Sequence, residues 1–149
     1  MNNIDQNMNA SENLDQVKEQ IRLSYAHLIN VHIRHCYRYN QFKNKVKSEK
    51  LKKGFQQINR YFFDESGKIN WETILPLMPP EIEEKIKKEY NMLNENEIRL
   101  CCLHLFSVPG SDIADILPYA HTSIHSTTYR IKRKVGTKNL IEKFKDMLL

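Results

Sequence analysis

The stretch from Ser111 to Gly136 restricts the possible fold more than any other part of this chain, because it contains two short helical patterns joined by a tight turn. Ser111 is a suitable N-cap residue for the first helix. Pro118 ends that helix, since proline disfavours helical geometry at the residue before it. The apolar face of the first helix is formed by Ile113, Ala114, Ile116 and Leu117. The second helix is predicted from about Thr122 to Val135.

One side of the second helix is predicted to pack inward. It is formed by Ile124, Ile131 and Val135, with Thr127 or Thr128 filling the missing turn. Ala114 precedes Ile124 by ten residues. This spacing is typical of a helix-turn-helix, in which a small residue lies where the helices cross and an apolar residue holds the second helix in place.

The opposite side of the second helix is polar and basic, which favours a surface that reads duplex DNA. From Tyr129 to Lys138 the chain has five basic residues and no acidic one. We expect His125, Ser126 and Tyr129 to meet base edges, because polar side chains on such a helix reach the major groove. The full set of predicted contact residues is Ser111, Thr122, His125, Ser126, Tyr129, Arg130, Lys132, Arg133 and Lys134.

The segments IADIL and YAHTSIHSTTYRIKRKVG resemble the C-terminal DNA-binding domain of LuxR-type bacterial regulators. In that family a similar Ile-Ala helix precedes a recognition helix that ends in Ile-x-x-Lys-Leu-Gly. That ending corresponds to Ile131, Lys134, Val135 and Gly136. Upstream, LNENEIRLCCLHLF is similar to the opening helix of the family, with Leu93 and Glu97 at its Leu-Thr-x-x-Glu positions. The resemblance covers roughly Leu93 to Leu148 and implies a four-helix domain whose fourth helix often contributes to dimerisation.

The run from Tyr129 to Lys134 is most similar to a Bacteroidetes-like subset in which a helical segment precedes the domain. The sequence departs from the family pattern at two positions. Asn94 replaces the usual threonine, and Ala120 stands where a capping serine is common, which moves the expected start of the recognition helix to His121 or Thr122. Region four of sigma factors has a similar architecture.

The remaining chain is predicted to be helical as well, so that the fold class is all-α. Residues 1–12 are polar and asparagine-rich and are predicted to form a disordered tail. Residues 13–63 form a long amphipathic segment, with one helix from Leu14 to about Lys53 and a shorter one to Phe63. Its apolar residues include Leu14, Val17, Ile21, Leu28, Val31 and Phe42. So long a helix needs a partner surface, either its own domain or a second copy of the chain.

Residues 64–92 are predicted to be a helical linker, and residues 93–149 the helix-turn-helix domain. In the linker, Trp71 begins an apolar face that ends at Pro79, and a second helix follows. Asn94 and Glu97 form a plausible capping pair, and Gly136 can end the recognition helix in a left-handed conformation. The last helix has a packing face of Leu140, Ile141, Phe144, Met147 and Leu148.

Charge and cysteine content limit the possible partners and the cellular compartment. The 149 residues carry a formal charge of +5, which favours an anionic partner. The lysine-rich stretch from Lys43 to Lys53 fits a solvated face or an additional phosphate contact. Cys36, Cys101 and Cys102 lack a Cys-x-x-Cys spacing, which is consistent with a reducing cytoplasm. His32, His35 and Cys36 could share one side of a helix, but core packing is favoured over a metal site.

The sequence favours one of three classes of function. The favoured one is a transcriptional regulator that binds double-stranded DNA as a homodimer, with RNA polymerase or an upstream sensor protein as further partners. The alternative is a protein-interaction module with the same fold, since fold alone does not fix function. An enzyme is not expected, because the chain has no phosphate-binding glycine loop and no Ser-His-Asp pattern. No cofactor and no membrane insertion are expected.

Overall fold

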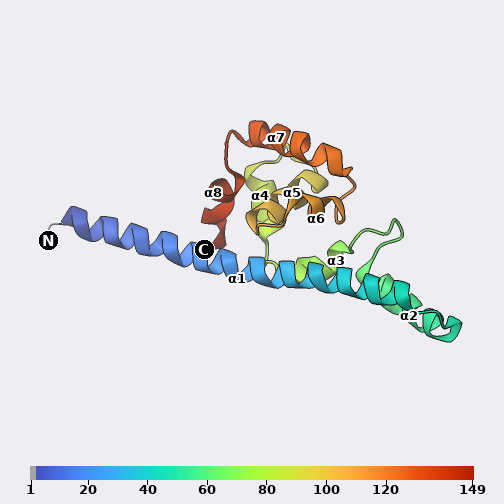
Figure 1. The fold of residues 1–149 in the computed structure, drawn as a ribbon. Helices are drawn as coiled ribbons and strands as arrows, with labels where there is room; N and C mark the ends of the chain where they lie inside the picture. The colour runs from blue at the N-terminus through green and yellow to red at the C-terminus, as the bar shows by residue number, and fades with distance from the viewer. Residues whose placement is uncertain (1–2) are drawn as a thin grey trace.

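The computed structural model describes residues 3–149, with side chains from Asn9 onward, and these residues form an all-α protein. No β-strand occurs between residues 3 and 149, although Phe63 and Ile69 form an isolated antiparallel bridge that closes the turn between them. The fold consists of one very long helix with a globular helical body on one side (Figure 1).

Helix α1 (Asn3–Lys45) has 43 residues and is therefore about 65 Å long. The predicted disordered tail is wrong for residues 3–12, which continue the helix; residues 1–2 lie outside the described part of the chain. No glycine or proline occurs before Gly54, so nothing in the local sequence interrupts the helix.

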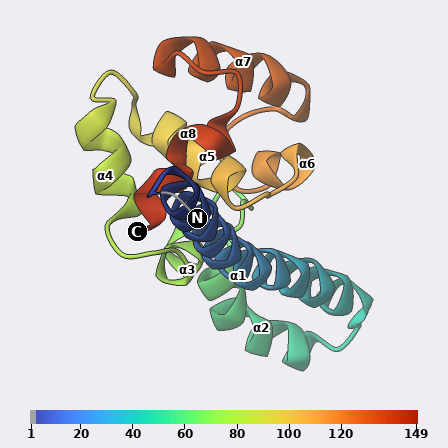
Figure 2. The same cartoon turned by 90° about the vertical axis from the view of Figure 1, so that its left-hand side faces the viewer.

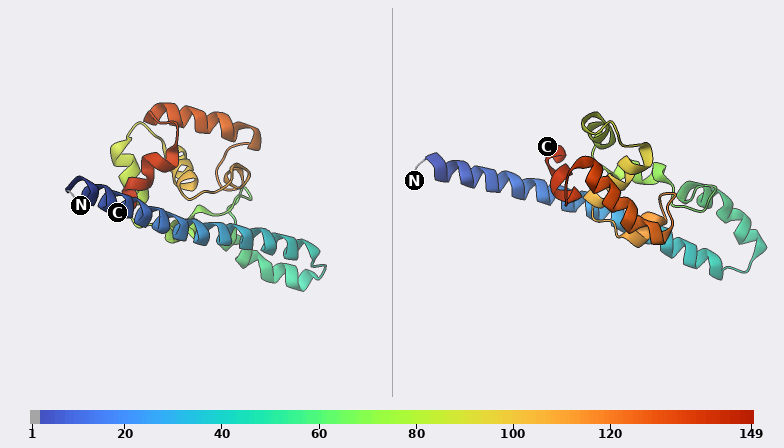
Figure 3. Two further views of the ribbon diagram at one scale, coloured as in Figure 1. Left: turned by 60° about the vertical axis from the view of Figure 1, so that its left-hand side comes forward. Right: turned by 90° about the horizontal axis from the view of Figure 1, so that it is seen from above.

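Helix α2 (Glu49–Phe62) runs back along the C-terminal end of α1 (Figure 3). The prediction of one helix from Leu14 to Lys53 is wrong, because the chain turns at residues 46–48 and the Ser48 side chain accepts a hydrogen bond from the Leu51 backbone N–H. The resulting hairpin is held by aromatic rings. Tyr39 contacts Phe55 and Phe62, and Phe42 contacts Phe55.

The globular body contains the short helices of the C-terminal half of the chain. They are α3 (Trp71–Ile74), the 3-10 turn Leu75–Leu77, α4 (Ile82–Glu89), α5 (Glu95–Leu105), α6 (Gly110–Ala114), the 3-10 turn His121–Ser123, α7 (Ile124–Val135), α8 (Leu140–Phe144) and the 3-10 turn Lys145–Leu148. Residues 64–92 are not a separate linker. Ile69, Ile74, Ile82 and Ile86 are fully buried in the same core as the side chains of α5.

Helix α1 packs on this body with one face. Ala26, Ile29, Ile33 and Cys36 are buried there. The earlier part of the contact is polar: Arg22 donates to the carbonyl of Leu105 (3.1 Å) and to Ser107 Oγ (2.7 Å). The long helix therefore folds back on its own domain along this face, which was one of the two expected partner surfaces.

The far end of the contact is formed by Tyr37, whose hydroxyl lies 2.9 Å from Asp112 Oδ1 and 2.5 Å from Asp115 Oδ2. Burial, reinforced by these two carboxylates, raises the pKa of Tyr37, so the phenol keeps its proton and donates it. Because Asp112 lies in α6, Tyr37 connects α1 directly to the first helix of the helix-turn-helix.

The residues considered as metal ligands have other roles. Cys36 is fully buried, and burial raises the pKa of its thiol to about 11. His32 Nε2 lies 2.8 Å from Thr73 Oγ1, between α1 and α3. Cys101 and Cys102 are also fully buried, as expected for packing residues.

Candidate nucleic-acid interface

The helix-turn-helix is present as two helices of unequal length. Helix α6 has five residues and α7 has twelve. Ser111 does not cap the first helix: the N-cap is Pro109, and Ser111 is an exposed residue of the first turn. A 3-10 turn that begins at His121 precedes α7, so the helix proper begins two residues after the predicted Thr122.

The inward face of α7 agrees with the prediction. Ile131 is fully buried, and Ile124 and Val135 are almost so. Both Thr127 and Thr128 are buried beside them, and Ala114 is fully buried in α6. This side of α7 therefore packs on the body, and the opposite side is free.

A half-buried histidine supports the middle of α7. His104 Nε2, on α5, lies 3.0 Å from Thr128 Oγ1. The Thr128 hydroxyl donates to the Ile124 carbonyl (2.8 Å), so it must accept from a protonated Nε2 of His104. Burial, together with nearby Lys132, lowers the pKa of His104 to about 4 and keeps the imidazole neutral at pH 7.

The C-terminal end of α7 is fixed in two ways. Gly136 has φ +72°, and the Thr137 N–H donates to the Lys132 carbonyl (3.0 Å), as in a Schellman motif. Lys134 Nζ donates to Glu97 Oε2 on α5 (2.7 Å). Lys134 therefore has a partner within the chain, and this ion pair competes with its predicted role as a phosphate contact.

Glu97 also completes the N-terminal cap of α5. Asn94 Oδ1 accepts from the Glu97 N–H (2.8 Å), and Glu97 Oε1 accepts from the Asn94 N–H (3.0 Å), which is the predicted capping box. Burial raises the pKa of Glu97, but the hydrogen bonds from Asn94 and Lys134 outweigh it and leave the pKa lowered. The ionised carboxylate thus holds α5 and α7 together.

The outward face of α7 contains most of the predicted contact residues. Tyr129 is 60% exposed, and Lys132 is half-buried. The remaining predicted residues, Thr122, His125, Ser126, Arg130 and Arg133, are all exposed. Residues 116–141 contain no aspartate or glutamate, so α7 and the turns on either side of it contribute no negative side chain to this face. Figure 2 shows α7 at the outer edge of the body, on the side away from α1.

A shallow cavity of about 370 Å³ lies beside the N-terminal half of α7. It is lined by His104, Gly110, Ser111, His121, Ile124, His125, Thr128 and Lys132. It brings Ser111 to the same surface as His125. His121 also lines this cavity, although the sequence pattern did not predict it as a contact residue. His121 Nε2 lies 3.4 Å from Asp115 Oδ1, so its charge is partly offset when it is protonated.

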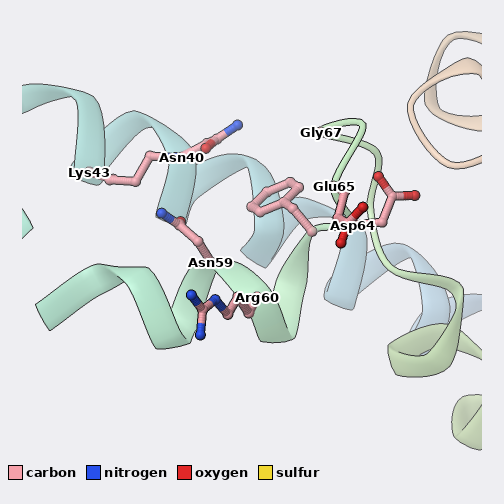
Figure 4. Close-up of a pocket in the computed structure, with 8 residues that line it drawn as sticks. Asn40, Lys43, Asn59, Arg60, Asp64, Glu65 and Gly67 are labelled. Carbon is pink, nitrogen blue, oxygen red and sulfur yellow. The ribbon is translucent and has the colours of Figure 1, made fainter. Parts of the chain in front are cut away.

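A second cavity, of about 580 Å³, lies at a distance from α7, where the hairpin of α1 and α2 meets the turn after α2 (Figure 4). Its lining mixes cations and carboxylates: Lys43 and Arg60 on the helices, and Asp64 and Glu65 on the turn. Lys43 Nζ lies 5.9 Å from the centre of the Phe63 ring. The mixed charges do not favour an anionic ligand, so this cavity does not add to the cationic face of α7.

Comparisons of the chain with protein-family models, curated proteins and solved structures gave no match. Among the residues described, no helix combines the length and the apolar character needed to cross a membrane.

Proposed function

We propose that this chain binds duplex DNA through α7 and acts as a transcriptional regulator, in line with its resemblance to LuxR-type DNA-binding domains. The observation that carries the proposal is the division of α7 into two faces. One face is buried on the body, and the other exposes polar and cationic side chains from residues 116–141, a stretch of sequence that contains no carboxylate. A helix presented in this way fits the major groove and is attracted by the phosphate backbone.

The roles of the side chains follow from their positions. His125, Ser126 and Tyr129 lie on successive turns of the exposed face, so they are our candidates for base edges. Arg130, Lys132 and Arg133 are our candidates for phosphate contacts. Lys134 forms an ion pair with Glu97, so we expect Lys134 to contribute less to DNA affinity than the other basic residues of α7. His104 orients α7 through Thr128 without adding charge at neutral pH.

The proposal implies a protein that has no catalytic role and acts in the cytoplasm, where RNA polymerase or a sensor protein would be its further partner. The competing proposal, a helix-turn-helix that binds only protein, has the same exposed helix but requires no phosphate contacts. Salt dependence and base discrimination separate the two.

The first test measures base discrimination. A preferred duplex is selected from a random pool, and affinities for it and for a mutated site are compared. His125→Ala and Tyr129→Ala should each reduce discrimination by about 1–3 kcal/mol per lost base contact, while the melting temperature barely changes. Tyr61→Ala is the matched control, because Tyr61 is 61% exposed on α2, away from α7. It should leave discrimination unchanged.

The second test measures the salt dependence of affinity. With about four to six phosphate contacts, the log-log slope for one domain should be roughly −4 to −5, and Lys132→Ala and Arg133→Ala should each reduce it by about one. Lys88→Ala, an exposed lysine on α4, is the control. If His125, Tyr129, Lys132 and Arg133 can all be replaced without loss of DNA binding, α7 does not enter the groove and the protein-binding proposal is preferred.

A further inference from the structure

Helix α1 exposes a row of apolar side chains beside the face that packs on the body. We term this row the seam: Leu14, Val17, Ile21, Leu28, Val31 and Phe42. Leu14, Val17, Leu28 and Phe42 are 48–60% exposed, and Ile21 and Val31 are half-buried. At about 100° per residue, the centre of this row lies about 130° around the helix from Ala26, Ile29, Ile33 and Cys36, which pack on the body. The body therefore adjoins the row at Ile21 and Leu28 but leaves most of it exposed.

The spacing of the seam suits another helix. Leu14, Ile21, Leu28 and Phe42 are separated by multiples of seven residues, and Val17 and Val31 lie three residues after Leu14 and Leu28. Apolar residues at these spacings form the contact row of a coiled coil. The row is interrupted at Ser24, His35 and Arg38, so it is a short pairing surface rather than a continuous coiled coil.

Helix α1 is also longer than its own domain requires. Its first ion pair with the body joins Asp15 to Lys145 (3.3 Å), and the turns before this point project past the body (Figures 1 and 3). At the other end α1 and α2 project as a hairpin. An isolated helix gains little stability from propensity alone, so the projecting turns favour a partner surface.

The C-terminal helix is not free for the pairing that the LuxR-type resemblance suggests. Phe144 is fully buried, Leu140 nearly so, and the following 3-10 turn lies against α1. Lys18 pairs with Asp146 (2.9 Å), and Lys145 pairs with Asp15 and Glu19 (3.3 Å each). Pairing of two chains therefore has to use another surface.

The charges along the α1–α2 hairpin favour one direction for a paired helix. Residues 9–19 contain three carboxylates, Glu12, Asp15 and Glu19, and one lysine. Residues 34–53 contain eight Lys and Arg residues and one glutamate. Two parallel helices would place the basic ends together, whereas antiparallel helices place each acidic end beside a basic one.

We propose that a second copy of this chain packs on the seam with its α1 antiparallel, so that the protein is a homodimer. Leu28 pairs with Val31 of the partner helix, and Val31 pairs with Leu28 of the partner helix. The two-fold axis therefore passes between these two positions. Val17 then faces Phe42 of the second copy, and Glu12 to Glu19 lie beside its basic residues 40–47. A groove of about 580 Å³ beside Ile21 and Leu28, walled by Pro79, Pro80 and the C-terminal Met147 and Leu148, gives the second helix additional apolar contact.

The oligomeric state is the first test, and it requires no DNA. Light scattering or sedimentation at tens of micromolar should give about 35 kDa, twice the 17.7 kDa of one chain. Leu28→Glu should shift the dissociation constant of the dimer upward by at least tenfold, because it places a charge at the centre of the seam. Leu23→Glu is the matched control: Leu23 is 44% exposed on α1 but lies outside the seam, so the dimer should persist.

Cysteine cross-linking tests the direction and the register. Oxidation of a mixture of Val17→Cys and Phe42→Cys proteins should give a cross-linked dimer, and Val17→Cys alone should give almost none. Efficient self-cross-linking of Val17→Cys would show a parallel pair and overturn the antiparallel arrangement. A wild-type protein that stays monomeric, with helicity intact by circular dichroism, would overturn the dimer itself. Neither result affects the DNA-binding proposal, since the seam and α7 lie on separate faces.

Discussion

The surroundings of His104 on α5 lead to a pH dependence of stability whose size follows from its pKa. The pKa of His104 is lowered from 6.5 to about 4 because burial and Lys132 both disfavour the imidazolium. The folded state therefore binds the proton less tightly than the unfolded state. The contribution of His104 to stability is complete above about pH 6.5 and is lost as the pH falls toward 4.

The magnitude follows from the two pKa values. At pH 4.5 nearly all unfolded molecules carry the proton on His104, while most folded molecules do not. The free energy of unfolding should therefore fall by about 2.5 kcal/mol between pH 7.5 and pH 4.5 on account of this residue alone, and by roughly 1.4 kcal/mol at pH 5.5.

Urea unfolding of the wild type and His104→Gln at several pH values isolates this contribution. Glutamine keeps an N–H donor for Thr128 but does not titrate, so the stability of His104→Gln should decline less between pH 7.5 and pH 4.5. The difference between the two declines should be about 2–3 kcal/mol. A side-chain NMR titration of His104 gives the pKa directly. A measured pKa near 6.5, together with parallel stability profiles, would refute the buried neutral histidine.

Two further substitutions on α7 separate packing from contact. Ile131→Ala removes a fully buried side chain, so it should lower the free energy of unfolding by about 2–4 kcal/mol in urea titrations and should weaken DNA binding only by depleting folded protein. Lys134→Ala should change the salt slope of DNA binding by clearly less than the one unit expected for Lys132→Ala, because Lys134 already forms an ion pair with Glu97. Equal effects of Lys134→Ala and Lys132→Ala on the slope would contradict that assignment.

Local patterns were sufficient to predict the buried face and the end of α7. The seven- and four-residue spacing of Ile124, Ile131 and Val135 identified the buried face, and Gly136 identified the end of the helix. Asn94 and Glu97 form a capping box within one turn of helix, which sequence alone can show. Such features depend on residues close in the chain, so their chemistry is visible before the fold is known.

The features that sequence analysis missed depend on residues far apart. Lys134 forms an ion pair with Glu97, 37 positions away in the sequence. His104 forms a hydrogen bond with Thr128 of α7, 24 positions away. Residues 64–92 resemble a linker in the sequence, but their apolar side chains are buried in one core together with those of α1 and α5. The break at residues 46–48 has little local signal, since lysine-rich sequence on both sides favours a helix.

The two proposed surfaces lie on separate parts of the molecule. α7 lies on the side of the body away from α1 (Figure 2), whereas the seam lies on α1 itself, beside the face that packs on the body. A second chain on the seam therefore leaves α7 free. Pairing of two chains and binding of DNA can then occur on the same molecule, and loss of one need not abolish the other.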